Sequence, residues 1–308
     1  MRKRFPSFSS LSFSNDDTTT LPITDTAYDS ANPISTPLPA SSSFISCRFI
    51  SLSCSQSGGA LAFTAGGENS VIECIFSRCS STLSFGNCYG GGAVFSNSGS
   101  LLSVSSSKFI SCSTQSIGGG LLCTSDCESS SVSECFFFGC SAETCAGGMS
   151  THYGPRGSVS SSSFVLCTSK WTGGGIYHNS LFDRSHVSIS NSLFKENNAK
   201  SIVDHTPGGG GFGDFRENTY TSKYSFLFFT GNIAPINTAY DIFIRDNPIT
   251  LDCIKHCFTT TTSTQSFYNN GQYQFNWLPL TTVSLSLSNN KQIYARISSS
   301  FTFIFILR

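Results

Sequence analysis

The sequence predicts an all-β protein built as a parallel β-helix, a solenoid of about six to seven coils. Three observations predict this fold. A Phe-x-x-Cys or Phe-x-x-Asn unit recurs through the middle of the chain, a Gly-Gly unit lies between successive members, and a β-branched residue precedes most of these phenylalanines by five positions. The composition also disfavours long helices, because it is rich in serine and glycine and poor in strong helix formers.

The Phe units set the length of the repeat, since successive phenylalanines lie 27 to 35 residues apart. The first unit has Leu52 where the others have Cys or Asn. The expected structural ladder consists of Phe49, Phe76, Phe109, Phe137, Phe164, Phe194 and Phe229, with Cys79, Cys112, Cys140, Cys167, Asn197 and Asn232. Stacked phenylalanine side chains, at roughly 1.5–3 kcal/mol each, would supply much of the stability.

The Gly-Gly units mark a second strand of each coil. They begin at Gly58, Gly91, Gly118, Gly147, Gly173 and Gly209. The distance from Gly-Gly to the next Phe is 17 to 21 residues, whereas the distance from Phe to the next Gly-Gly is 9 to 15. Insertions concentrated in one arm are typical of a solenoid, in which one face tolerates loops and the stacked faces do not.

A third column lies five residues before each Phe and marks a further strand. Its members are Phe44, Val71, Val104, Val132, Val159, Ile189 and Tyr224. Strand side chains alternate between faces, so an odd spacing cannot bury both columns unless the chain turns a corner between them. Ser, Cys and Asn in the interval suit that corner. An antiparallel sandwich with glycine turns is the alternative fold.

The chain divides into three segments. Residues 1–40 hold five of the ten prolines and lack apolar periodicity, which indicates a flexible lead. Residues 41–245 carry the β-helix repeats, and residues 246–308 form a β-rich closing tail. Arg2 to Arg4 could begin a signal peptide, but Pro6 and several serines interrupt the apolar stretch that would have to follow.

Charge excludes several functions. Only 12% of residues are charged, and 18 basic residues balance 18 acidic ones, so no basic surface for nucleic acid or anionic membrane is expected. The apolar stretch from Phe301 to Leu307 is too short to span a bilayer, which needs about 20 residues. The glycine runs are not followed by the Lys of a phosphate-binding loop.

The repeats resemble those of a known family. Gly58-Gly59-Ala60-Leu61 and Phe194-Lys195-Glu196-Asn197 are similar to the paired GGA[ILV] and FxxN repeats of polymorphic outer membrane proteins, which are chlamydial autotransporter adhesins. Such repeats also occur in large Ser- and Cys-rich surface-type proteins of anaerobic protists. The resemblance spans about residues 41–245 and implies a right-handed parallel β-helix of the pectin-lyase-like type, exposed at a cell surface and used in adhesion. Four ladder positions depart from the family pattern, because they carry Cys in place of Asn.

The 14 cysteines allow two interpretations. Equivalent residues in neighbouring coils lie roughly 4.8 Å apart, within the range that a disulfide spans, so Cys112–Cys140 or Cys140–Cys167 could form cross-links. The ladder cysteines could equally remain buried thiols that pack as small apolar residues. Connectivity cannot be derived from the spacing. Cys47, Cys74 and Cys135, two residues before Phe, form a second column.

One further column contains residues that bind metals or carry protons. Five residues after the first glycine of successive units lie Cys123, His152, His178 and Asp214. Stacked in neighbouring coils, they are weak candidates for a zinc site or a proton relay. A polar column at a strand end is the alternative. No cofactor is expected.

The enzymes that would suit this fold use clustered carboxylates, and this sequence has no recurring acidic cluster. Glycosidases of any fold use paired acids, and the best candidates here, Asp183 next to Arg184 and the Asp214–Glu217 run, read more simply as solvated loops. The sequence therefore predicts a non-enzymatic, adhesin-like protein at the cell surface or outside the cell. Its expected partners are host, cell-surface or polysaccharide ligands. A polysaccharide lyase or hydrolase of the same fold and a purely structural stalk or wall element are the alternatives.

Overall fold

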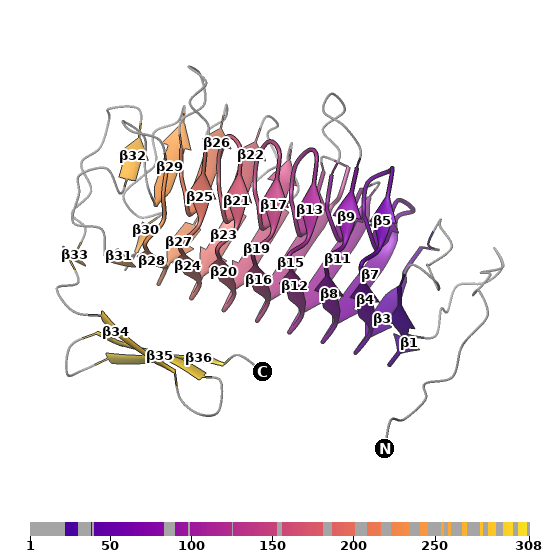
Figure 1. Ribbon diagram of the computed structural model, residues 1–308, viewed down its shortest axis with the longest axis horizontal. Coiled ribbons are helices and arrows are strands. Elements are labelled where there is room, and N and C mark those ends of the chain that lie inside the picture. Colours follow the sequence, from indigo (N-terminus) through magenta and orange to yellow (C-terminus); the bar gives the residue numbers. More distant parts are fainter. Residues whose placement is uncertain are drawn as a thin grey trace.

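The computed structural model describes residues 22–29, 38, 40–82, 90–97, 99–124, 126–152, 156–180, 187–200, 208–216, 223–234 and 241–245, and the further strands β30 to β36 between Ile254 and Ile306. Every regular element in these ranges is a β-strand, and four of the five sheets are entirely parallel. Figure 1 shows the strands stacked in rows along the long axis. The chain therefore winds as a parallel solenoid, as the repeats predict.

Two of the parallel sheets contain the β-branched column and the Gly-Gly units. The Val sheet consists of β1 (Ile23–Thr24), β3 (Ser43–Ile45), β7 (Gly67–Ile72), β11 (Ser100–Ser105), β15 (Ser129–Ser133), β19 (Arg156–Ser160), β23 (Val187–Ser190), β27 (Lys223–Ser225) and β30 (Ile254–Lys255). The Gly sheet consists of β6 (Leu61–Phe63), β10 (Val94–Ser96), β14 (Leu121–Cys123), β18 (Met149–His152), β22 (Ile176–Ser180), β26 (Phe212–Arg216), β29 (Ile242–Arg245) and β32 (Phe267–Asn269).

The other two parallel sheets lie on either side of the Phe-x-x-Cys corner. The Phe sheet consists of β2 (Ala27–Tyr28), β4 (Arg48–Ile50), β8 (Ile75–Ser77), β12 (Lys108–Ile110), β16 (Phe136–Phe138), β20 (Ser163–Val165), β24 (Leu193–Lys195), β28 (Phe228–Thr230), β31 (Phe258–Thr259) and β33 (Leu278–Pro279). The short sheet consists of β5 (Ser53–Cys54), β9 (Ser80–Ser81), β13 (Ser113–Thr114), β17 (Ser141–Ala142), β21 (Thr168–Ser169) and β25 (Asn198–Ala199). The repeat pattern did not predict the short sheet, because two residues per coil carry no periodicity.

The solenoid extends beyond the expected repeat segment at both ends. Strands β1 and β2 pair with β3 and β4, so the expected flexible lead contains a paired coil segment, whereas residues 1–21 lie outside the described ranges. Strand β29, the last strand within the expected repeat segment, pairs with β32 as well as with β26. The tail then ends in an antiparallel sheet of β34 (Val283–Leu287), β35 (Gln292–Ile297) and β36 (Phe301–Ile306).

Each coil turns two sharp corners at a single left-handed residue. The residues at the first corner, between the Val and Phe sheets, have φ between 48° and 54°: Ser46, Glu73, Ser106, Glu134, Ser161, Asn191 and Phe226. The residues at the second corner, between the Phe and short sheets, have φ between 53° and 62°: Ser51, Arg78, Ser111, Gly139, Leu166, Glu196 and Gly231. Only Gly139 and Gly231 lack a side chain, so most corners adopt a conformation that L-residues disfavour.

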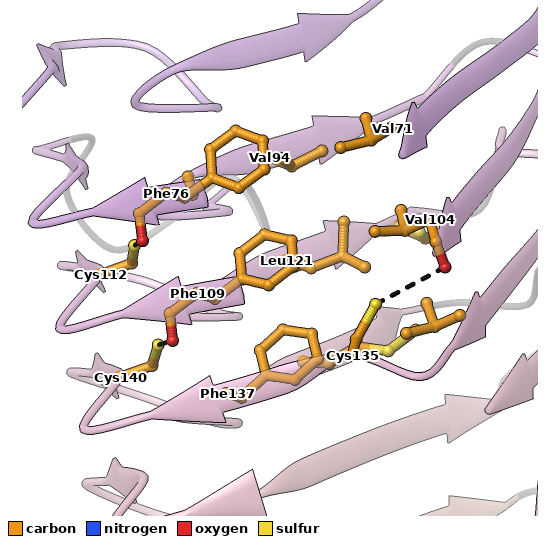
Figure 2. Packing of buried hydrophobic residues seen from close by; sticks show 14 of the residues in the cluster. Val71, Phe76, Val94, Val104, Phe109, Cys112, Leu121, Cys135, Phe137 and Cys140 are labelled. Atoms are coloured by element: carbon orange, nitrogen blue, oxygen red, sulfur yellow. Dashed lines mark hydrogen bonds between the residues drawn. The ribbon is translucent and has the colours of Figure 1, made fainter. Parts of the chain in front are cut away.

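The residue after each corner points inward, and at most corners its side chain hydrogen-bonds a backbone carbonyl; Leu52 and Leu227 are apolar exceptions. At the second corner the thiols of Cys112 and Cys140 donate to the carbonyl oxygens of Phe76 and Phe109, one coil earlier, at 3.7 and 3.4 Å (Figure 2). At the first corner, Cys135 donates likewise to Val104 O at 3.6 Å. These side chains therefore give buried backbone carbonyls a further donor beside the strand ladder.

The phenylalanine column runs in register through the Phe sheet and forms a continuous ring stack. From Phe49 to Phe229 neighbouring ring centroids lie 4.5 to 5.2 Å apart, and the ring planes deviate from parallel by 4° to 11°. Tyr28 continues the stack beyond Phe49. Figure 2 shows these rings beside the inward side chains of the Val and Gly sheets, such as Val104 and Leu121. The rings are buried and fill the centre of the solenoid.

The Gly-Gly units exist because the chain passes close to the backbone of the next coil. A Cβ on Gly119 would lie 2.2 to 2.7 Å from backbone atoms of that coil, among them Gly147 O at 2.2 Å and Ser141 O at 2.5 Å. The preceding residue, Gly118, has φ of 73°, which favours glycine. The following residue, Gly120, faces the ring of Phe137. Small residues at this third position thus connect the Gly-Gly motif to the Phe-x-x-Cys motif.

Candidate functional site

The candidate metal column lies on the inward face of the Gly sheet, but with one member different from the prediction. Cys123 pairs in register with Thr151, Thr151 with His178, and His178 with Asp214. His152 lies one position further along β18 and pairs with the next strand through Asn179. The prediction that His152 belongs to this column is therefore wrong.

The displacement of His152 has a backbone cause. Ala146 has φ of 57° and occupies the left-handed position that Gly118 and Gly173 occupy in the neighbouring coils, with φ of 73° and 65°. Gly147 is thus the second residue of its unit, although it is the first glycine in the sequence. A count of five residues from Gly147 reaches His152, whereas a count from Ala146 reaches Thr151.

His152 lies on the outer side of β18 and is nevertheless only 4% exposed. Its Nε2 lies 3.4 Å from Asn179 Nδ2, and its ring centroid lies 6.2 Å from that of Tyr177. Burial, and secondarily the charge of His178, lower the pKa of His152 to about 4. The side chain is therefore neutral at physiological pH.

His178 and Asp214 each form a side-chain hydrogen bond inside the solenoid. His178 Nδ1 and Thr151 Oγ1 share a hydrogen bond of 2.6 Å, and the Tyr224 hydroxyl donates to Asp214 Oδ2. None of these four side chains is more than 1% exposed. The two pairs therefore lie in the core of the solenoid and not on a surface that a substrate in solution contacts. The sequence pattern did not predict that Thr151 belongs to this column or that Tyr224 contacts Asp214, since both depend on the local register.

The described ranges contain no group of three or more His, Cys, Asp or Glu side chains that could hold a metal ion. In the column itself, Thr151 separates Cys123 from His178. Of the acidic candidates for catalysis, Asp214 points into the core, whereas Asp183, Arg184 and Glu217 lie outside the described residues.

The described cysteines are all free thiols, so neither Cys112–Cys140 nor Cys140–Cys167 is a disulfide. Burial and the neighbouring thiol of Cys140 raise the pKa of Cys112 well above its ordinary value. Asn197 performs the same task as the ladder cysteines, because its Nδ2 donates to Phe164 O at 2.9 Å. The cysteines and the asparagines of the ladder thus have the same role in this chain.

The outer faces of the sheets differ in what they offer a partner. The outer side of the Gly sheet is covered by a second apolar cluster that includes Phe95, Leu122 and Tyr177. The outer side of the Phe sheet is mixed, with Lys108 beside Phe136 and Ile110 beside the 37% exposed Phe138. The outer side of the Val sheet carries the most regular pattern in the described part of the chain, a repeated Ser-x-Ser.

Four consecutive strands of the Val sheet present this pattern in register: Ser103 and Ser105 in β11, Ser131 and Ser133 in β15, Ser158 and Ser160 in β19, and Ser188 and Ser190 in β23. The residues between them, such as Val104 and Val132, point into the core. The serines form two columns of hydroxyl groups, about 4.8 Å apart along the stack and about 6.6 Å apart along each strand.

Comparisons with protein-family models, curated proteins and solved structures gave no match. In the described part of the chain, no helix has the length and apolar character that crossing a membrane requires.

Proposed function

We propose that the chain is a non-enzymatic, surface-exposed protein of adhesin type, which binds extended ligands along the outer face of its Val sheet. The single observation that supports this proposal is the two-column hydroxyl array of β11, β15, β19 and β23. Ser103, Ser131 and Ser158 are exposed. A hydroxyl group both donates and accepts hydrogen bonds, so the array suits a ligand whose polar groups also repeat.

The array has two further properties that favour a long, neutral ligand. Its serine columns carry no charge from Ser103 to Ser190, and the first charged member is Lys223 in β27. Serine side chains are short, so a partner can approach the sheet closely over several coils. Because the sheet is backed by the buried Val column, the hydroxyls are held on a rigid support and lose little freedom on binding.

The test compares one change inside the array with one outside it. Ser131→Arg places a long charged side chain at the centre of the array, and Gln115→Arg places the same side chain at an exposed position after β13. Binding of the purified variants to intact cells and to immobilised polysaccharides is measured. We expect Ser131→Arg to reduce binding at least about tenfold, which corresponds to about 1.4 kcal/mol, and Gln115→Arg to leave it unchanged.

Two other measurements separate this function from its alternatives. Labelling of intact cells with a membrane-impermeant reagent should modify the protein, and a strictly cytosolic location would contradict the proposal. Incubation with pectin-like and other polysaccharides, with and without Ca²⁺, should release no shorter products. Release of such products would support a polysaccharide lyase or hydrolase instead, and equal binding by all variants would favour a purely structural element.

A further inference from the structure

Four of the eleven described cysteines lie outside the two corner columns, and two of these, Cys123 and Cys127, contact each other in the core. The other seven lie in the corner columns: Cys47, Cys74, Cys79, Cys112, Cys135, Cys140 and Cys167. Cys123 lies in the inward column of the Gly sheet, and Cys127 lies in the connection between β14 and β15. Carbonyl satisfaction at the corners therefore does not explain this pair.

The surroundings of Cys127 are unusually polar for the core of this solenoid. Ser96 Oγ and Ser100 Oγ share a hydrogen bond of 2.5 Å and lie 3.6 and 3.7 Å from Cys127 Sγ, so one of the two hydroxyls at a time can donate to the sulfur. The protonated thiol itself donates to Ser100 O at 3.2 Å or to Ser129 O at 3.3 Å. Cys123 reaches the same cluster, because it pairs in register with Ser96 and its thiol hydrogen-bonds with that of Cys127. Hydroxyl donors around a sulfur stabilise its thiolate form.

The chemistry of the two thiols differs in the way that disulfide exchange requires. The hydrogen bond from Cys123, with those from the two serines, lowers the pKa of Cys127 to about 7, whereas the same contact and burial raise the pKa of Cys123. Cys127 is thus the thiol that ionises first, and an attacking thiol with a pKa near ambient pH exchanges efficiently. Cys47 also has a lowered pKa, but its sulfur has no hydroxyl donor among the described contacts and lies in the first-corner column.

We propose that Cys123 and Cys127 are a redox-active dithiol, which closes to an intramolecular disulfide by exchange with a low-molecular-weight disulfide. In the first step the Cys127 thiolate attacks one sulfur of the reagent, which forms a mixed disulfide and releases one reagent thiolate. In the second step Cys123 gives up its proton and attacks Cys127 Sγ, which releases the second reagent thiol. The protein pair loses two electrons and the reagent gains them.

A short turn provides access to the pair. Cys127 is 2% exposed, but its N–H closes a turn onto Thr124 O at 2.9 Å, and the exposed Asp126 lies within that turn. Local opening of this turn would expose Cys127 and would break that hydrogen bond and the contacts of its sulfur with Ser96 and Ser100. The ladder thiols of Cys140 and Cys167 lack this route, since each follows a corner in the middle of the stack.

The test equilibrates the folded full chain with mixtures of oxidised and reduced glutathione and then labels the cysteines in two stages. Free thiols are blocked with one alkylating reagent, the protein is unfolded and reduced, and newly released thiols are labelled with a second. Peptide mapping reports each site. We expect Cys123 and Cys127 to take up the second label together over one range of glutathione ratios, at least about tenfold more than Cys140 and Cys167.

Single variants show whether the two residues pair with each other. Cys127→Ser keeps a hydrogen-bonding side chain and should abolish the second label on Cys123. In Cys123→Ser, Cys127 has no protein partner and can form only a mixed disulfide with glutathione. Circular dichroism confirms that each variant is folded. Absence of the second label at both sites in the wild-type chain would overturn the proposal, as would undiminished disulfide labelling of Cys123 in Cys127→Ser. The result is independent of ligand binding by the Val sheet.

Discussion

The backbone N–H of Cys167 donates to the side-chain Oδ1 of Asn197 at 2.9 Å, at the point where the cysteine part of the second-corner ladder meets the asparagine part. Asn197 N donates in the same way to Asn232 Oδ1 at 3.0 Å. An asparagine thus serves two coils, because its Nδ2 also donates to a phenylalanine carbonyl one coil earlier. A cysteine offers its thiol as the donor and only a weak acceptor.

This junction predicts that the ladder can be extended by one asparagine. Cys167→Asn should place an amide donor near Phe137 O, which the thiol now reaches at 3.6 Å, and should keep the free energy of unfolding within about 1 kcal/mol of the wild type. Cys167→Val removes the thiol donor, and the carbonyl keeps only its strand hydrogen bond, at a cost of about 0.5–1.5 kcal/mol. Urea unfolding followed by circular dichroism measures both values. Equal destabilisation by Asn and Val would show that volume, not hydrogen bonding, decides this position.

Adjacent glycines should respond very differently to the same added methyl group. A Cβ on Gly119 would meet backbone oxygen atoms at 2.2 and 2.5 Å, which cannot move without separating two coils. A Cβ on Gly120 would meet Gly148 O at 2.8 Å and the Phe137 ring at 2.9 Å, and the equivalent residues of two other coils are Ala60 and Ala93.

We therefore expect Gly119→Ala to cost more than about 3 kcal/mol, in the range of severe overpacking, and Gly120→Ala to cost about 1–2 kcal/mol. Thermal unfolding of the two variants provides the comparison. If Gly119→Ala does not fold, the yields of soluble protein from the two variants can be compared instead, and that of Gly119→Ala should be the lower. A Gly119→Ala protein as stable as Gly120→Ala would mean that the coils can separate at this column.

The spacing of Phe49 to Phe229 predicted their stack, because an apolar residue that recurs once per coil must lie at the same buried position in every coil. The corner between Val104 and Phe109 was predicted for a similar reason, since five residues of plain strand cannot bury both. The left-handed corner residues escaped prediction because Ser, Glu, Asn and Leu share no side-chain property there. The left-handed conformation of Ala146 could not be predicted either, because alanine gives no signal for it. The count of five residues therefore began one residue too late and placed His152 in the column in error.

The pKa of His152 predicts an acid-dependent loss of stability that one substitution should remove. The folded-state pKa of about 4 lies below the ordinary value of 6.5, so the unfolded chain binds the proton first as pH falls. The stabilisation from the neutral, buried ring is fully present above pH 6.5 and is lost as pH falls from 6.5 to 4. The total is of order 3 kcal/mol, since each pKa unit corresponds to about 1.4 kcal/mol.

The measurement is the free energy of unfolding in urea at a series of pH values between 7.5 and 4, for the wild type and for His152→Asn. Asparagine does not titrate in this range, so the difference between the two pH profiles isolates His152 from His178 and the surface carboxylates. We expect the wild type to lose about 2–3 kcal/mol more than the variant over this range. Parallel profiles would mean that water reaches the ring, and that the outer side of β18 opens more readily than its 4% exposure indicates.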